Sequence, residues 1–425
     1  MKNILLINTN CSINKGSAAQ VISTKETLES LISPSNFILS SHYPELDFKL
    51  CNEHNVKIFA LINTNFPSGF FRLLLGRTRL LFCLFRCLLW SMLCKVGLNA
   101  KGLINEELLK IYSESDLIID LSGDTLSDKY VCSLFSILNI LIGILLKKKI
   151  VIFSQSIGPF RRITIPLARF CLNKADLIII REKITKSYLE RINIHNHLIH
   201  LGADIAFLLK PAPRKTVQEI FLKEKINVNR TKYPIIGIGT SARIYRILGL
   251  NKAIYLELMA KTADFLVEKL NAQVILVPHV IIPDKYEQQD DRFVAEKIHY
   301  LARNKNRIKI IKNDYSPEEL KGIIGRCKLF IGSRMHSNIA STSMYVPTIA
   351  LSWSHKYRGI MKMMGQEKYV CDIKTITFDE LILKINDAWN NRAELKNHLQ
   401  LSIRMMEKSA LFTCRLVSDL VNLTK

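Results

Sequence analysis

The sequence predicts an α/β protein with two doubly wound, Rossmann-like domains facing a cleft, followed by a helical C-terminus. Three observations lead to this prediction. Short runs of Val, Ile and Leu alternate with helical stretches over most of the 425 residues. Many of these runs lack polar alternation, which is typical of strands buried on both faces of a parallel sheet. The alternation breaks once near the middle of the chain, so we expect two domains.

The strands are predicted from apolar runs that end at polar or turn-forming residues. In the first half they cover Ile4–Asn8, Lys57–Ile62, Leu117–Leu121, Ile150–Ser154 and Leu177–Ile180. In the second half they cover Ile235–Gly239, Val274–Pro278, Ile308–Ile311, Leu329–Ile331 and Thr348–Leu351. The uncharged run 133–146 is shorter than the roughly 18 residues that cross a bilayer, so we expect a buried helix there.

The break in the alternation places the domain boundary. The stretch 210–234 is polar and basic and contains three prolines, and a fresh apolar strand follows it. We therefore expect an N-terminal domain over 1–210, a linker over 211–233, a C-terminal domain over 234–390 and C-terminal helices over 391–425.

Composition narrows the class of partners and the compartment. The net charge of +23 favours anionic partners, and because no nucleic-acid-reading motif is present we expect no nucleic acid among them. The ten cysteines form no CxxC pair, which favours reduced, buried thiols in a cytoplasmic protein. The N-terminal "MKNILLINTN" has too short an apolar run for a signal peptide and fits a first strand.

An apolar, basic insertion occupies about 68–98 of the first domain. Arg72, Arg79 and Arg86 recur every seven residues and stay near one face of a helix, while the other faces carry Leu, Phe, Cys and Trp90. The interruption by charge argues against a membrane span. Two interpretations stay open: a helix at a membrane interface, or a helix packed on the sheet with its arginines in water.

Ligands of doubly wound folds bind beyond the carboxyl ends of the strands, so the residues that follow each strand are the site candidates. After the first strand, Asn14, Gly16 and Ser17 open a helix whose free N–H groups can bind an anion; a plain helix cap is the alternative. After the third predicted strand, "SGDTLSD" supplies Gly123 for close approach and Asp124 or Asp128 as a base, or else a solvated turn.

Two further candidates close the first domain. Arg181 directly follows an apolar strand and opens a helix, so we expect it to point into the cleft and bind an anion. Asp204, in "LGAD", is either a hinge residue or a cleft carboxylate.

The second domain offers similar strand ends. Arg243 follows "IGIGTS", and His279 follows "VILVP", either as a ligand-binding residue or as a core histidine bonded to a carbonyl. His279 with Asp290 and Asp291 could in principle bind a metal, but nothing in their spacing fixes a geometry, so we expect no metal.

The strongest candidate is "GSRMHS". Ser333 and Arg334 follow a strand directly, and an Ala- and Ser-rich helix begins with His336 in its first turn. The planar guanidinium fits a carboxylate or phosphate, and the helix N-terminus adds partial positive charge. An anion bound here would favour the protonated form of His336, which predicts a general acid.

Taken in order, "NKGSAA", "DLSGDTLSD", "SQSIGPF", "ADLIIIREKITKSYL", "GADIAFLL", "GSRMHSNIAS" and "SHKYRGIMKMMG" resemble the polysaccharide pyruvyl transferase family. The resemblance covers nearly the whole chain. It implies a GT-B-like fold and transfer of a pyruvyl group from phosphoenolpyruvate to two hydroxyls of a sugar, giving a ketal and phosphate. It implies no required cofactor beyond the donor substrate.

The resemblance also implies roles for residues. Arg181 and Arg334 would hold the phosphate and carboxylate of phosphoenolpyruvate on the C-terminal side, near Lys356 of "SHKYRG", and His336 would protonate the methylene carbon. Asp124, Asp128, Asp204 and Asp291 all qualify as the base, and the acceptor would lie near 14–17 and 122–128. Two residues depart from the family pattern: Asp124 stands where glycine is common, and Ser17 stands where the family has an acid.

Alternatives from other classes stay open. One is a sugar-nucleotide glycosyltransferase on the same architecture, and another is a non-enzymatic component of polysaccharide assembly. The acceptor is expected to be a sugar of a surface polysaccharide precursor. Two further points stay open: whether this acceptor is lipid-linked, and whether residues 70–98 make peripheral contact with the inner face of the cell membrane.

Overall fold

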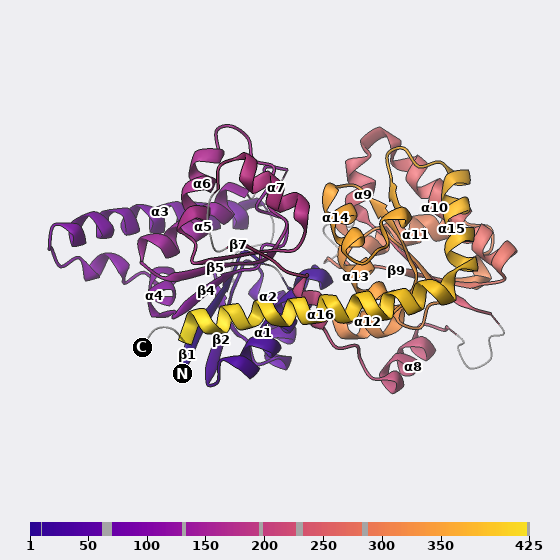
Figure 1. The fold of residues 1–425 in the computed structure, drawn as a ribbon, viewed down its shortest axis with the longest axis horizontal. Coiled ribbons are helices and arrows are strands. Elements are labelled where there is room, and N and C mark those ends of the chain that lie inside the picture. Colours follow the sequence, from indigo (N-terminus) through magenta and orange to yellow (C-terminus); the bar gives the residue numbers. More distant parts are fainter. Residues whose placement is uncertain are drawn as a thin grey trace. The chain divides into compact units, whose positions relative to one another are not determined.

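The computed structural model describes residues 1–9, 11–61, 70–129, 133–194, 199–226, 233–282 and 288–422. The chain forms two compact units, which Figure 1 shows. Unit 1 comprises residues 1–12, 20–205 and 409–425, and unit 2 comprises residues 13–19 and 206–408. The short segment 13–19 therefore belongs with unit 2, although the chain around it belongs with unit 1.

Unit 1 contains a parallel sheet of seven strands in the order β3-β2-β1-β4-β5-β6-β7. The chain builds outward from β1 in one direction and then returns to its other side with β4, which is the doubly wound pattern. The strands are β1 (Lys2–Ile7), β2 (Ser35–Ser41), β3 (Lys57–Ala60), β4 (Leu117–Asp120), β5 (Lys149–Gln155), β6 (Leu177–Ile180) and β7 (Ile199–Leu201). Leu5, Ile118, Ile152 and Ile178 from four adjacent strands are fully buried, as the continuous apolar runs predict.

Helices cover both faces of this sheet. They are α1 (Lys15–Leu31), α2 (Pro44–Glu53), α3 (Phe70–Lys95), α4 (Glu107–Glu114), α5 (Ser133–Leu145), α6 (Ile165–Lys174) and α7 (Lys183–Arg191), with the 3-10 turns η1 (Lys101–Ile104) and η2 (Ile205–Leu208). The uncharged run expected as a buried helix is α5, whose residues Ile137, Ile140 and Ile142 lie in the core. No helix among the described residues is long and apolar enough to cross a membrane.

Unit 2 contains a parallel sheet of six strands in the order β10-β9-β8-β11-β12-β13. The strands are β8 (Ile235–Gly239), β9 (Gln273–Val277), β10 (Ile308–Ile310), β11 (Leu329–Gly332), β12 (Thr348–Ser352) and β13 (Val370–Asp372). The point where the strand order reverses lies between β8 and β11, which pair from Leu329↔Ile236 to Gly332↔Gly239. Ligand sites of such sheets lie at the carboxyl ends of the strands beside this point.

The helices of unit 2 follow its strands in alternation. They are α8 (Arg214–Lys223), α9 (Ala242–Ile247), α10 (Lys252–Leu270), α11 (Asp291–Leu301), α12 (Pro317–Ile324), α13 (Met335–Ser343), α14 (His355–Met363), α15 (Phe378–Asn390) and α16 (Arg392–Asn422), with the 3-10 turns η3 (Gly249–Asn251), η5 (Lys305–Arg307) and η6 (Glu367–Tyr369). Helix α16 has residues in both units, since unit 1 includes the chain from Ser409 onward.

The predicted fold class is confirmed: both sheets are parallel and doubly wound, and the C-terminus is helical. The sequence patterns missed β2, β7 and β13. These strands have at most three consecutive apolar residues, and β7 and β13 are short edge strands that need no long apolar run. The segment expected as a linker, 211–233, contains α8, whose residues Val217, Ile220 and Phe221 are buried in the core of unit 2; residues 227–232 lie outside the described part.

Candidate active site

The carboxyl ends of β8, β9 and β11 are joined by one buried carboxylate, that of Asp291 at the start of α11. Its Oδ1 accepts a hydrogen bond from the Ala242 N–H at 2.7 Å. Its Oδ2 accepts from the N–H groups of His279 at 3.1 Å and Val280 at 2.8 Å. The same carboxylate binds Arg334, so it fixes three separate loops around a single point. Because both oxygens of Asp291 already accept these hydrogen bonds, Asp291 is a poor candidate for a base.

Arg334 is held by Asp291 in a two-pronged contact. Its Nε donates to Oδ2 at 3.0 Å and its Nη2 donates to Oδ1 at 2.5 Å. Burial acts to lower the pKa of Arg334, but the Asp291 carboxylate outweighs it and raises the pKa, so the cation is permanent. About 18% of the side chain is exposed, and Nη1 makes no hydrogen bond to any described residue. The guanidinium is thus oriented by one edge and can bind an anion with the other.

His336 lies in the first turn of α13, and its ring packs against the backbone of Gly16. A Cβ at position 16 would lie 2.2 Å from Nδ1 of His336, which no side chain tolerates. Only glycine therefore permits this approach. Gly16 and His336 are 320 positions apart in the chain, and each was selected from its own stretch of sequence.

The segment 13–19 reaches this position through backbone contacts within unit 2. Asn14 forms an antiparallel bridge with Val280, and the Lys15 N–H donates to the His279 carbonyl at 3.0 Å. The Asn14 side chain accepts from the Gly16 N–H at 3.0 Å, which caps the start of α1, and Ser17 follows in its first turn, partly exposed. The structure places 13–19 in unit 2, beside His279 and His336, and 122–128 in unit 1. The expected acceptor-side role of both segments stays a prediction.

His279 is 5% exposed, and its Nδ1 has no hydrogen-bond partner among the described residues. Burial lowers the pKa of His279 to about 3, and the positive charges of Arg334, His336 and Lys15 act in the same direction. The imidazole also bonds to the backbone of Val277, as the core-histidine alternative expects. At neutral pH His279 is consequently uncharged and serves as a polar neighbour of the site, not as its acid.

A small cavity lies between these groups, with a volume of about 20 Å³. This is space for roughly one water molecule. It is lined by Lys15, Ala19, Ala206, Leu209, His279, Pro317, Lys321, His336, Ile339 and Ala340. Two lysines among its walls, with no carboxylate, make this an electropositive site.

The two lysines of the cavity were missed by the sequence patterns. Lys15 is 5% exposed and pairs with the Asp314 carboxylate at 2.5 Å. Lys321, on α12, is 4% exposed and donates to the Leu209 carbonyl at 2.5 Å, and burial lowers its pKa to about 8. Lys15 stands inside the motif "NKGS" and could have been selected there, whereas nothing in the sequence around Lys321 marks it as buried.

Ser333, Arg243 and Lys356 surround the same strand ends. Ser333 is fully buried; its Oγ accepts from the Tyr255 hydroxyl at 3.1 Å and its carbonyl accepts from the Tyr357 hydroxyl at 2.9 Å. These two tyrosines, which sequence analysis missed, fix the turn that carries Arg334. The cations of Arg243 and Lys356 both lie over the ring of Trp353, with Cζ at 5.5 Å and Nζ at 4.9 Å from its centroid.

In unit 1 the sequence-selected carboxylates have mostly structural partners. The Asp128 Oδ2 accepts from the Arg161 N–H at 2.6 Å and from the Thr164 hydroxyl, so this residue holds the turn before α6. That role argues against Asp128 as the base. Asp124 stays partly exposed beside Gly123, whose φ of +68° and 3.3 Å approach to Gln20 require a glycine.

A buried polar network that the sequence patterns missed lies beneath Gly123. Asp120 ends β4 with 0% exposure, and its carboxylate accepts from Asn8 at 2.9 Å, from the Ser122 N–H at 2.8 Å and from Gln155 at 2.6 Å. Burial raises the pKa of Asp120 despite these hydrogen bonds. The signal available in the sequence was a carboxylate that closes an apolar strand, in "LIID". The network fixes the loop that carries Gly123 and Asp124.

The expected anion-binding role of Arg181 does not fit its surroundings. The Arg181 side chain is 1% exposed and Asp204 is 0% exposed, and Nη1 bonds to Oδ2 at 2.6 Å. The Nε group donates to the Ser156 hydroxyl at 2.9 Å. Arg181 and Asp204 thus form a buried ion pair in unit 1, because each neutralises the charge that the other would leave in the core. The same pairing removes Asp204 from the candidates for a base.

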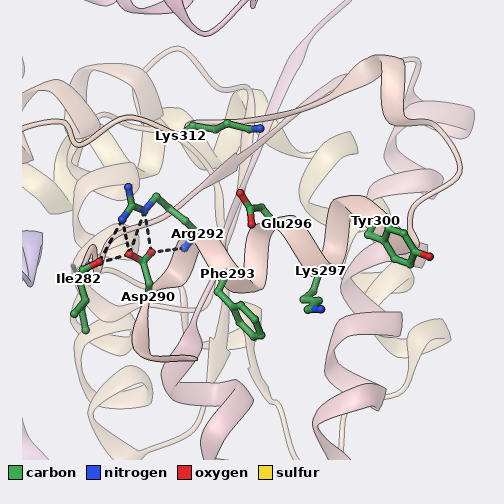
Figure 2. Close-up of a pocket in the computed structure, with 8 residues that line it drawn as sticks. All are labelled: Ile282, Asp290, Arg292, Phe293, Glu296, Lys297, Tyr300 and Lys312. Carbon is green, nitrogen blue, oxygen red and sulfur yellow. Dashed lines mark hydrogen bonds and ion pairs between the residues drawn. The ribbon is translucent and has the colours of Figure 1, made fainter. Parts of the chain in front are cut away.

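A larger hollow of about 680 Å³ runs along α11, and of the residues considered in the sequence analysis it contains Asp290. Figure 2 shows Arg292 in this hollow with its guanidinium against the carboxylate of Asp290. Asp290 also caps α11 by accepting from the Arg292 N–H at 2.7 Å. No group of three or more His, Cys, Asp or Glu side chains that could hold a metal ion occurs within the described ranges. The candidate site is therefore the cluster around Arg334 and His336.

A family model described as "Polysaccharide pyruvyl transferase" matches residues 14–355. The amylovoran biosynthesis protein AmsJ of Erwinia amylovora is 24% identical over 307 residues, which are 72% of this chain and 72% of that protein.

Solved structures share the fold at low sequence identity. Anabaena Alr3699/HepE in complex with UDP-glucose has a TM-score of 0.62 at 10% identity, with 100% of both chains covered. The UDP-GlcNAc 2-epimerase of Methanocaldococcus jannaschii has a TM-score of 0.59 at 15% identity, with 98% of this chain and 99% of that chain covered. These structures establish a GT-B-like fold for the chain.

Proposed function

Because this chain belongs to the polysaccharide pyruvyl transferase family, we propose that it transfers a pyruvyl group from phosphoenolpyruvate to two hydroxyls of a sugar in a surface polysaccharide precursor. The observation that carries the proposal is the arrangement of Arg334 and His336 at the start of α13. A permanent cation held by Asp291 stands beside an imidazole packed on Gly16. A doubly anionic donor with a carbon to be protonated needs both groups.

The proposed reaction uses these residues in sequence. Arg334, with the N-terminus of α13, binds an anionic group of phosphoenolpyruvate. Protonated His336 gives its proton to the methylene carbon, and C2 becomes electrophilic as the double-bond electrons form the new C–H bond. A sugar hydroxyl attacks C2 and loses its proton to a base, phosphate leaves with the electrons of the C2–O bond, and the second hydroxyl adds to C2 and loses its proton. The products are a cyclic ketal and inorganic phosphate.

The structure changes the proposed assignments in two respects. With Arg181 buried against Asp204, we propose Lys15 and Lys321 of the cavity wall as further cations of the donor site. Arg243 and Lys356 add positive charge at the same strand ends. Among the four carboxylates considered as a base, Asp124 is partly exposed, whereas the side chains of Asp204 and Asp291 are 0% exposed. Asp128 accepts hydrogen bonds that hold the turn before α6. We therefore propose Asp124 as the base and an acceptor that reaches the loop of Gly123.

Thermal unfolding with added ligand tests the donor. At 100 times its dissociation constant, phosphoenolpyruvate should stabilise the protein by about 2.7 kcal/mol. This stabilisation should disappear in Arg334→Ala and remain in Arg303→Ala, which removes an arginine of unit 2 whose side chain is 76% exposed. Stabilisation by UDP or GDP, with none by phosphoenolpyruvate, would instead support a glycosyltransferase and reject the pyruvyl proposal.

A second variant separates chemistry from binding. His336→Gln should keep the stabilisation by phosphoenolpyruvate, while release of inorganic phosphate in the presence of acceptor falls about 10²- to 10⁴-fold. Equal phosphate release by His336→Gln and the wild type would exclude His336 as the acid.

A further inference from the structure

Helix α3 of unit 1 has two apolar faces, of which only one is used in the core. Leu80, Cys83 and Cys87 lie on the inner face, with exposures of 6%, 0% and 0%, and pack in the same cluster as Ile137 of α5. Figure 1 shows α3 extending past the edge of the sheet, and its distal part is accompanied by the returning segment with η1. The inner face explains how α3 packs on the core of unit 1. It does not explain the apolar side chains of α3 that lie outside the core.

The outer face of α3 carries a continuous apolar stripe. Leu81, Phe85, Leu88 and Met92 follow one another at intervals of four, three and four residues, which places them on one side of a helix. Their exposed fractions are 50%, 64%, 43% and 66%. The same region exposes Leu74, Leu75, Phe82, Val96 and Leu98. Scattered exposed apolar residues are ordinary, but a contiguous exposed stripe marks a surface that another partner covers.

The charges along α3 identify the chemistry of that partner. The 26 residues of the helix include no acidic residue. Arg79 is anchored to Glu106 at 2.5 Å, and Arg86 donates to the Leu103 carbonyl at 2.7 Å while its guanidinium lies over the Phe82 ring at 5.5 Å. Arg77 and Lys95 add further positive charge; the side chain of Arg72 lies outside the described part. The charged residues of α3 itself that flank the apolar stripe are thus all cations, of which Arg79 is paired with Glu106.

We propose that this outer face of α3, together with Val96 and Leu98 directly after the helix, docks into the interfacial region of an anionic lipid bilayer. An apolar face bordered by arginine and lysine inserts among acyl chains while its cations meet anionic headgroups. A second copy of the chain fits less well, because a symmetric contact through this face would bring two basic helices together. The net charge of +23 favours an anionic surface for the same reason.

This docking does not depend on which reaction the chain catalyses. If the proposed acceptor is lipid-linked, docking would hold the protein at the surface where that acceptor lies. Vesicle binding is measured without substrate, so failure of the pyruvyl proposal and failure of the docking proposal give different results.

Cosedimentation of the full chain with lipid vesicles tests the proposal. Wild-type protein should bind vesicles that contain phosphatidylglycerol and bind phosphatidylcholine vesicles weakly, with less binding at high salt. The triple variant Leu81→Ser, Phe85→Ser and Met92→Ser should lower the bound fraction by about tenfold or more. Its control is Ile163→Ser, Leu222→Ser and Leu250→Ser, which removes three apolar side chains elsewhere that are 86%, 72% and 101% exposed.

Circular dichroism establishes that both triple variants fold, since all six side chains lie on the surface. The control should bind vesicles as the wild type does. No binding of the wild type to any vesicle, or equal binding by the wild type and the α3 variant, would overturn the proposal. A wild-type dimer that becomes a monomer in the α3 variant, without vesicle binding by either, would overturn it in favour of a second copy.

Discussion

Two arginines that look alike in sequence have different surroundings in the two units. Arg181 directly follows β6, and Arg334 stands two residues after β11, so each lies at the carboxyl end of a parallel strand. Each is paired with an aspartate that is fully buried. Yet the Arg181 side chain is 1% exposed, whereas that of Arg334 is 18% exposed.

The difference lies in what covers each guanidinium. Arg181 has Asp204 at one nitrogen and the Ser156 hydroxyl at another, so protein groups surround its charge. Arg334 uses Nε and Nη2 on Asp291 and keeps Nη1 outside the contacts of the described residues. A strand-end arginine is therefore an anion site only where the protein leaves one edge of its guanidinium open. In the first arrangement both charges are enclosed by protein groups, and in the second one edge of the guanidinium stays open for the anion that we propose.

The largest expected effect comes from breaking the buried pair of unit 1. Asp204→Ala leaves the Arg181 cation buried without compensation, which should lower the free energy of unfolding by about 3–5 kcal/mol. Arg181→Met with Asp204→Leu replaces both charges by apolar groups and should recover most of that loss. Urea unfolding of the wild type and both variants gives the comparison.

The same variants can also contradict the proposed difference between Arg181 and Arg334. If Asp204→Ala kept wild-type stability but abolished stabilisation by phosphoenolpyruvate, Arg181 would belong to the ligand site after all. If the double replacement were no more stable than Asp204→Ala, the uncompensated charge would not be the cause of the loss.

A smaller effect concerns the neutral histidine of unit 2. The pKa of His279 is about 3 in the folded state, because of burial, and about 6.5 when unfolded. Between these values the unfolded chain binds one more proton, so stability is fully present above pH 6.5 and falls as the pH drops toward 3. Between pH 7 and pH 5 the loss from this residue should be about 2 kcal/mol.

His279→Gln removes the titrating group and keeps an amide that can donate a hydrogen bond. Urea unfolding at pH 7 and pH 5 should therefore show a drop that is about 2 kcal/mol smaller in His279→Gln than in the wild type. Carboxylates elsewhere titrate equally in both proteins and cancel in this difference. Identical drops in the two proteins would mean that His279 is accessible to protons in the folded state.

The sequence was sufficient for most strands of the two sheets, but not for β2, β7 and β13, and for selecting candidate residues of the site. Continuous apolar runs such as Leu177–Ile180 and Ile235–Gly239 coincide with strands in the structure, because burial on both faces leaves a clear pattern. Strand β2 begins and ends with serine and asparagine residues, so its three apolar residues gave no such pattern. Arg334 and His336 were selected because a strand end, a fixed cation and a helix start coincide within five residues.

The sequence could not predict which polar side chains are buried. Nothing local distinguishes Arg181, which is enclosed, from Arg334, which is not, since the difference comes from Ser156 and Asp204 at distant positions. The roles of Asp291 and Lys321 likewise depend on which carbonyl and N–H groups the folded chain brings to them. Spacing along the chain predicts the chemistry available at a strand end, whereas tertiary contacts decide which of it is accessible.

The smallest expected effect comes from the contact of segment 13–19 with His336. It tests whether the close approach of Gly16 positions the imidazole at the candidate site of unit 2. In Gly16→Ala the new Cβ would lie 2.2 Å from Nδ1 and 2.7 Å from Cβ of His336, so the imidazole or the helix start must move. Overpacking of this kind costs about 1–3 kcal/mol, and alanine returns about 0.5–1 kcal/mol of helix propensity, which leaves a net loss of about 1 kcal/mol. Gly102→Ala is the matched control, because a Cβ there meets nothing within 4 Å. Thermal unfolding should show a lower midpoint for Gly16→Ala alone, together with weaker stabilisation by phosphoenolpyruvate; an unchanged midpoint and unchanged stabilisation would mean that the contact between Gly16 and His336 does not position the imidazole.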